Sequence, residues 1–289
     1  MNDDEAGHAV LRQAVERYEA VLGSRLLAAY VLGSLAHGGF SPLVSDVDLG
    51  LVLTDPVDSS DAPTVGAVAE EIKAGGSPLH ERLSVFWGTP STLRGEQPGG
   101  RFPPLDRLDL LENGRLLAGA ECRTGLNGPG RDELLLAGAG FALDFLGPGR
   151  AATDPSSARL GSLKPAGREV LAEIRQPQQL ARQEVRHLTK VVLFPVRFLF
   201  TAATGRVGTN HAAVEYYRAD PKAPAHALVG QALTWRTTAP DPGAAADLLD
   251  RELLALYLQY IDDHIARLRD LGADDLGADF TAWRGELTA

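Results

Sequence analysis

Apolar residues in the first third of the chain follow two different periods. From Asp4 to Leu22 they recur every three or four residues, which predicts an amphipathic helix. The run Leu26–Leu32 is continuously apolar and predicts a buried strand, and a second strand is predicted at Asp46–Leu53. Ala62–Ala74 has a helical pattern, and the short apolar run Arg82–Trp87 predicts a third strand. Strands interleaved with helices predict a domain built around a sheet.

The pattern changes towards the middle of the chain. The segment Pro90–Pro104 is rich in glycine and proline and predicts a surface loop. Regular secondary structure is predicted again at Leu105–Leu117, within which Asn113 and Gly114 predict a turn. The polar run Thr153–Ser157 predicts a further loop.

Helical periodicity dominates the second half of the chain. It begins near Asp132 and includes two long segments, Arg182–Ala203 and Arg251–Leu268. A half that contains strands followed by a helical half is typical of an α+β protein. We therefore predict one domain at residues 1–130 and an all-α C-terminal domain at residues 131–289.

Composition and charge narrow the possible functions. The chain has 289 residues, and 44% of them are hydrophobic, which is enough for a packed core. The formal net charge is -10 and the pI is about 5.2. This acidity argues against a dedicated nucleic-acid coat but leaves a local basic groove open. The one cysteine, Cys122, excludes a disulfide framework and a cysteine-rich zinc site.

No segment predicts export or membrane insertion. The acidic start, Met1–Glu5, lacks the positive charge and the apolar run of a secretory signal. The longest apolar stretch, Val191–Phe200, is interrupted by Pro195 and Arg197 and is shorter than the ~20 residues of a membrane span. We therefore expect a cytoplasmic protein that does not contact a membrane.

One short stretch contains the candidate catalytic and metal-binding residues. Gly33 and Ser34 end the first predicted strand, where glycine permits a sharp turn and serine can cap a short helix whose N–H groups suit a phosphate. Asp46 and Asp48 begin the next strand, and residues two apart in a strand point to the same side. Two adjacent carboxylates repel each other unless a cation lies between them, and Mg²⁺ shares such ligands with substrate phosphates. The stretch therefore indicates metal-assisted phosphoryl or nucleotidyl transfer.

This stretch resembles the nucleotidyltransferase superfamily of DNA polymerase beta-like enzymes. The signature of that superfamily is Gly-Ser at a strand end followed by Asp-x-Asp on the next strand. The segment Asp109–Gly119 is similar to the end of the catalytic domain in small bacterial members, and Arg197–Ala213 is similar to the helical domain of aminoglycoside adenylyltransferases. The resemblance implies a nucleotidyltransferase-type catalytic domain with a mixed sheet.

One departure from the family pattern concerns a third carboxylate, which relatives carry on the strand after the Asp-x-Asp hairpin. Laid on this sequence, that position holds Ser84. A hydroxyl is a poorer Mg²⁺ ligand than a carboxylate and is no base at neutral pH. Glu81 lies three residues before Ser84, and because strand residues alternate between faces, its side chain is expected on the face opposite to Ser84. The other candidates for the base are Asp109, Glu112 and Glu184.

Basic residues gather along one face of the segment Arg182–Ala203. Arg182, Arg186, Lys190 and Arg197 fall within a sector of roughly 80° at ~100° per residue. Two interpretations stay open. The segment is either an ordinary amphipathic helix with solvated charges, or a nucleotide-binding face in which Arg186 and Lys190 offset the triphosphate charge that Mg²⁺ leaves.

These observations lead to one main hypothesis and two alternatives. The main hypothesis is a Mg²⁺-dependent nucleotidyltransferase in which Asp46 and Asp48 hold the metal and Gly33 and Ser34 hold the triphosphate of ATP or another nucleotide. AMP would move to a hydroxyl of an aminoglycoside-like small molecule, a polycation that the negative charge attracts. The first alternative is a toxin-like enzyme acting on tRNA or protein. The second, suggested by Ser84, is a nucleotide-binding protein without catalysis.

Overall fold

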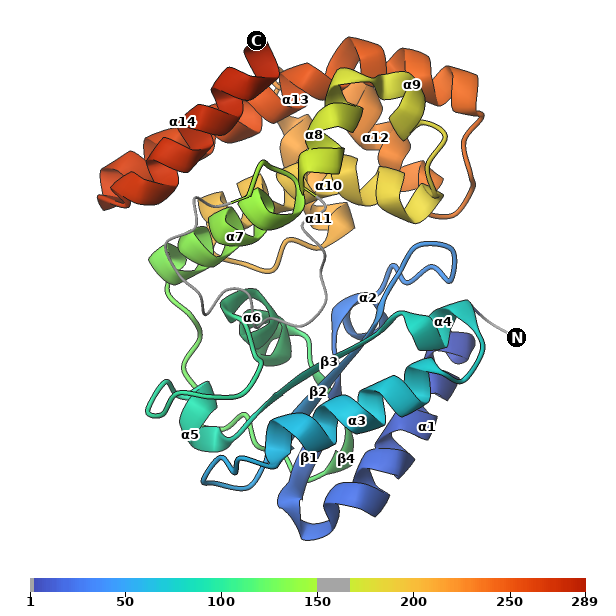
Figure 1. Ribbon diagram of the computed structural model, residues 1–289, viewed down its shortest axis with the longest axis vertical. Coiled ribbons are helices and arrows are strands. Elements are labelled where there is room, and N and C mark those ends of the chain that lie inside the picture. The colour runs from blue at the N-terminus through green and yellow to red at the C-terminus, as the bar shows by residue number, and fades with distance from the viewer. Residues whose placement is uncertain (1–2, 150–166) are drawn as a thin grey trace. The chain divides into compact units, whose positions relative to one another are not determined.

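The chain forms two compact units, Met1–Pro129 and Gly130–Ala289, in a computed structural model that describes residues 3–149 and 167–289 (Figure 1). A strand-containing unit followed by a helical one confirms the predicted α+β fold. The loop predicted at Thr153–Ser157 lies outside the described residues. No helix among the described residues is long and apolar enough to cross a bilayer.

A four-stranded sheet in the order β3-β2-β1-β4 forms the middle of the first unit. β1 pairs antiparallel with both β2 and β4, whereas β2 and β3 run parallel, so the sheet is mixed, as predicted. A parallel pair needs a long crossover between its strands, and two helices supply it here. The strands are β1 Leu26–Val31, β2 Val47–Leu53, β3 Leu83–Gly88 and β4 Arg115–Gly119.

The segment Pro90–Pro104 departs from the surface loop predicted for it. It contains a short helix, because Thr89 accepts a hydrogen bond from the Thr92 amide and Pro90 occupies the first helical position. The helices of the first unit are α1 Asp3–Leu22, the 3-10 turn η1 Gly23–Arg25, α2 Gly33–His37, α3 Asp61–Lys73, α4 Pro78–Glu81, α5 Pro90–Leu93 and α6 Pro104–Glu112.

Alternate residues of β2 divide the sheet into two faces. Leu49 and Leu51 are fully buried in a large core with side chains of α1 and α3, which cover one face (Figure 1). On the other face Val52 joins a smaller apolar cluster that includes Leu110 of α6. Successive strand residues point to opposite faces, so Asp48 lies on this second face. The fold therefore keeps the candidate site residue Asp48 and the main core on opposite sides of one sheet.

The second unit consists of helices throughout its described part. The helices are α7 Arg131–Phe145, α8 Gly167–Arg175, α9 Pro177–Leu180, α10 Val185–Thr204, α11 Asn210–Ala219, α12 His226–Trp235, α13 Pro242–Leu271 and α14 Asp274–Thr288. The helix α10 packs against α7, α11, α12 and α13. It differs from the prediction at its start, because Glu184 is the N-cap and the helix begins at Val185. Arg182 therefore lies in the preceding turn and not on the helix, which corrects the predicted segment Arg182–Ala203.

Candidate functional site

Asp48 and Ser84 lie side by side on neighbouring strands. The parallel register of β2 and β3 pairs these two residues directly, and both are half-buried. Paired residues of parallel strands project from the same face of the sheet. The register agrees with the predicted position of Ser84 and places a neutral hydroxyl next to the carboxylate of Asp48.

Asp46 lies one residue before β2. Between Asp46 and Asp48 stands Val47, whose side chain is fully buried in the core beneath α1 and α3. The Val47 amide donates to the carbonyl of Arg82 at 3.1 Å, so the extended pairing starts at this point. Alternation around Val47 puts the two aspartates on the same side of the chain.

Gly33 turns the chain at the end of β1, directly against Asp48. Its φ is +61°, a left-handed conformation that side chains other than glycine rarely adopt. A Cβ at this position would lie 2.1 Å from Oδ2 of Asp48, and the Leu32 amide donates to the Asp48 carbonyl at 3.0 Å. The glycine is therefore required twice, once by the backbone conformation and once by the carboxylate that occupies the space of a side chain.

Ser34 does not have the capping role predicted for it. The five-residue helix α2 begins at Gly33, its N-cap is Leu32, and no side chain caps it. Ser34 is the second residue of the helix because the left-handed Gly33 already makes the turn. The Ser34 hydroxyl is half-buried and lies one residue from the contact between Gly33 and Asp48.

Asp109, on α6, is the acid that the fold brings to this turn. Its Oδ2 accepts a hydrogen bond from the Gly33 amide at 2.6 Å, and its Oδ1 accepts one from the Asn113 side chain at 2.8 Å. Asp109 is only 8% exposed. Sequence proximity pointed to Asp109 as a base candidate but not to this contact, because the two residues are 76 positions apart.

The other acids considered as the base occupy different places. Glu81 ends α4 and Glu112 ends α6, and both are exposed. Glu184 is the N-cap residue of α10 in the second unit. Within the first unit, Asp109 is thus the candidate whose contacts reach Gly33.

The acidic pair fits a magnesium ion that arrives with a nucleotide. Across residues 3–149 and 167–289, no three side chains of His, Cys, Asp or Glu gather closely enough to hold a metal ion by themselves. Mg²⁺ in proteins is usually bound by one or two carboxylates, while substrate phosphates and waters supply the other oxygens. Asp46 and Asp48 match that donor set, and Ser84 adds a neutral oxygen beside it.

Three of the four basic residues predicted to share a face lie on α10. They are Arg186, Lys190 and Arg197. Nζ of Lys190 is 5.9 Å, and Cζ of Arg197 is 5.5 Å, from the centroid of the Phe194 ring, so both cations pack on one aromatic side chain. Nε of Arg197 also donates to the Gly208 carbonyl at 2.5 Å. Arg197 therefore ties α10 to the segment that leads into α11.

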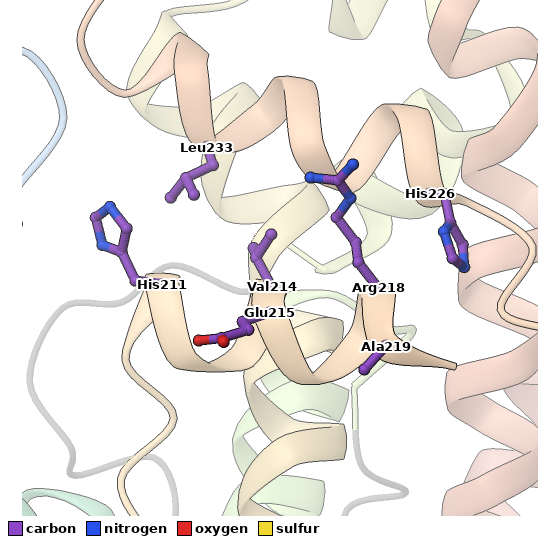
Figure 2. A pocket seen from close by; sticks show the side chains of 7 residues that line it. All are labelled: His211, Val214, Glu215, Arg218, Ala219, His226 and Leu233. Carbon is purple, nitrogen blue, oxygen red and sulfur yellow. The ribbon is translucent and has the colours of Figure 1, made fainter. Parts of the chain in front are cut away.

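The second unit contains an open pocket of about 560 Å³, which includes none of the predicted site residues (Figure 2). His211, Glu215 and Arg218 line it from α11, and Leu233 lines it from α12. Arg218 reaches towards α12, where a Cβ at Gly230 would lie 3.4 Å from the guanidinium. Charges of both signs line this pocket, so its chemistry favours no single class of ligand.

Comparison with known proteins identifies similar solved structures. Neither a protein-family model nor a curated protein matches the chain. The chain is similar to the crystal structure of spectinomycin adenyltransferase AAD(9) from Enterococcus faecialis, solved with ATP and spectinomycin. The match has 12% sequence identity and a TM-score of 0.49, and it covers 85% of this chain and 98% of the other. An adenyltransferase is thus among the solved structures to which this chain is similar.

Proposed function

We propose that this protein is a Mg²⁺-dependent nucleotidyltransferase that moves AMP from ATP to a hydroxyl group of a small, positively charged acceptor. One observation supports this most strongly. The Asp48 carboxylate fills the space in front of the Gly33 Cα. Asp46 is two residues before Asp48, where strand alternation predicts the same side. A carboxylate pair held against a tight turn at a strand end suits a metal–phosphate group.

The Gly33 turn and the two aspartates have separate roles in the proposed reaction. Asp46 and Asp48 hold the metal, which when bound would offset phosphate charge and stabilise the attacking and leaving oxygens. The Gly33 amide already donates to Asp109, so contact with the triphosphate falls to Ser34. The acceptor oxygen attacks the α-phosphorus, the bond to the β-phosphate oxygen breaks, and pyrophosphate leaves.

The hydroxyl proton of the acceptor needs a base during this step. Ser84 occupies the position beside Asp48 and cannot serve, because a serine hydroxyl does not accept a proton at neutral pH. A positioned general base typically contributes ~10²–10⁴-fold to the rate. We therefore expect slow turnover, with Asp46 or Asp48 or water taking the proton.

The acceptor is proposed to be a small polycation because of the charge of the protein. A net charge of -10 raises the local concentration of cationic molecules. It repels a polyanion such as tRNA, which requires a broad basic surface. An aminoglycoside-like amino sugar combines the required hydroxyl groups with positive charge.

Acceptor labelling with ATP carrying radioactive α-phosphate tests the proposal. The wild-type chain is incubated with labelled ATP, with or without Mg²⁺, and with amino sugars, tRNA or protein as separate acceptors. We expect Mg²⁺-dependent label on the amino sugar and stoichiometric pyrophosphate. Label on tRNA or protein would favour the toxin-like alternative, and ATP binding without label on any acceptor would favour the non-catalytic one. Glu16→Gln, an exposed acid on α1, is the control for a simple loss of negative charge.

The nucleotide-binding role of Arg186 and Lys190 is part of the same proposal. Both residues are half-buried on α10, one helical turn apart. Charge-assisted contacts to phosphate are stronger than neutral ones, so Arg186→Gln and Lys190→Gln should each weaken ATP binding by about tenfold. Isothermal titration with ATP and Mg²⁺ measures this, and Arg175→Gln on α8 is the matched control. Unchanged affinity in both variants would leave α10 as an ordinary amphipathic helix.

A further inference from the structure

A buried carboxylate from α6 holds the turn that carries Gly33. Oδ2 of Asp109 accepts the Gly33 amide proton at 2.6 Å, a short hydrogen bond to a charged acceptor. The donor belongs to a residue whose φ of +61° is uncommon, and whose Cα faces the carboxylate of Asp48. The bond therefore fixes the backbone unit that faces the Asp48 carboxylate.

Both oxygens of Asp109 are already engaged. Oδ1 accepts from the Asn113 side chain at 2.8 Å, and these residues are four apart on α6, so they share one face of the helix. A buried carboxylate is costly unless donors satisfy it, and here a backbone amide and a side-chain amide do so. A general base needs a lone pair that faces its substrate, whereas these contacts direct both oxygens towards the protein.

The surroundings of α6 reinforce the same turn. The Arg115 guanidinium, at the start of β4, donates to the Leu35 carbonyl in α2. The Arg123 guanidinium donates to the Gly114 carbonyl at 2.6 Å, which secures the link between α6 and β4. The Gly33 turn is thus held from the side of α6 and β4 by a carboxylate and by a guanidinium.

We infer that Asp109 is a positioning residue, which acts on the reaction through Gly33 and Asp48 and not by touching the substrate. The inference rests on the proposed function. For the rate of transfer, residue 109 must supply an oxygen that accepts the hydrogen bond from the Gly33 amide. The negative charge of residue 109 is not required. Asparagine keeps that oxygen, and the Asn113 amide can turn to present its own oxygen to the new NH₂ group.

Two substitutions separate this role from that of a third catalytic carboxylate. Asp109→Ala removes the acceptor and should lower kcat by about 10²-fold, because a small misplacement of a reacting group has that effect. Asp109→Asn should stay within about tenfold of wild type, because a neutral hydrogen bond replaces a charge-assisted one. The KM for ATP should change little in either variant.

A matched control is another buried acid of the same unit, Asp61, which is 2% exposed. It accepts a hydrogen bond from Arg25 at 2.5 Å, and the Arg25 guanidinium lowers the pKa of the Asp61 carboxyl. Asp61→Asn should lower the melting temperature and leave kcat unchanged where the protein is folded. The comparison therefore removes loss of stability as an explanation for a fall in kcat.

A second measurement reads the hydrogen bond directly. In wild type, the Gly33 amide proton should resonate downfield and exchange slowly with solvent. Asp109→Ala should abolish both signs, and Asp109→Asn should retain them. This NMR readout does not require activity, so it distinguishes a failure of the positioning role from a failure of the proposed function, which would show as absent transfer by wild type.

Three results would overturn the inference. The first is an Asp109→Asn variant as slow as Asp109→Ala, which would mean that the carboxylate charge acts directly. The second is an Asp109→Ala variant with wild-type kcat. The third is a Gly33 amide that exchanges freely in wild type. If Asp109→Ala does not fold, the pH–rate profile of Asp109→Asn tests the inference. A profile that loses its acidic limb would identify residue 109 as a titrating base and overturn the positioning role.

Discussion

The two faces of the sheet use alternate residues of the same strands for opposite purposes. On the face beneath α1 and α3, Leu49 and Leu51 are fully buried and belong to the larger apolar core of the unit. On the other face, Asp48, Gly50 and Ser84 interrupt a smaller apolar cluster. A strand with a period of two can thus stabilise the fold with one set of residues and bind a ligand with the other. The difference predicts that substitutions on the two faces have separable effects on transfer and on stability.

Asp48→Asn should have the largest effect on nucleotide transfer. The change preserves the shape of the side chain and removes half of the negative charge available to a metal. Loss of one preorganised electrostatic contact typically costs ~10²–10³-fold in rate. Pyrophosphate release under saturating ATP measures the change, and circular dichroism should show an unchanged fold. If Mg²⁺ and ATP bind equally well after Asp46→Asn and Asp48→Asn are combined, the assignment of the metal site is wrong.

Gly33→Ala should lower transfer by about 10²-fold, since the new methyl group displaces the Asp48 carboxylate. The matched control is Gly23→Ala, because Gly23 has a similar φ of +52° and nothing within 4 Å of an added Cβ. The control carries the backbone strain, about 1–2 kcal/mol, without the steric conflict. Equal kinetic losses in the two variants would show that the contact with Asp48 has no role in transfer.

Ser84→Asp should have a smaller effect, in the opposite direction. Without metal, two carboxylates side by side on neighbouring strands repel each other and lower the melting temperature. With Mg²⁺ the extra ligand should raise both the melting temperature and the rate, the latter by about tenfold or more. Ser84→Asn, which adds no charge, is the control. A Mg²⁺ response equal to that of wild type would place Ser84 outside the metal site.

Leu49→Ala should have the smallest effect on transfer, although it removes the side chain next to Asp48 in sequence. The side chain is fully buried on the helix-covered face, so its loss should lower the free energy of unfolding by about 2–5 kcal/mol. At temperatures where the variant is folded, kcat should stay close to the wild-type value. A large fall in kcat there would mean that the two faces are not independent.

Local patterns predicted most of the first unit. A continuous apolar run located β1, alternation ending in an apolar run located β2, and the short run before Gly88 located β3, each within a residue or two of its bounds. The spacing of Asp46 and Asp48 predicts that they lie on one side, because strand alternation is a local rule. The mixed pairing of the sheet came from the family resemblance and not from periodicity.

Other features depend on contacts that local patterns do not contain. The hydrogen bond between Asp109 and Gly33 joins distant segments, and nothing around either residue encodes the partner. Ser34 is not the cap because the helix begins at the left-handed Gly33, two residues before the position at which it would begin after a serine cap. Arg182 was assigned to α10 because helical periodicity continues through the turn that Glu184 ends. The metal-binding and nucleotide-binding roles of Asp46, Asp48, Arg186 and Lys190 stay predictions.

The hydrogen bond between Asp109 and Gly33 also affects the order in which the site is assembled during folding. β1 and β2 are joined by residues 32–46 and can pair early, whereas the Asp109 contact closes a longer loop of 76 positions and carries a larger entropic cost. Asp48 can therefore take its place in the paired strands before α6 packs and fixes the Gly33 turn. We expect native-state hydrogen exchange to follow the same order, with the Gly33 amide released by a partial opening of α6 that leaves the Leu51 amide protected. Simultaneous exchange of both amides would mean instead that sheet and turn fold as one cooperative block.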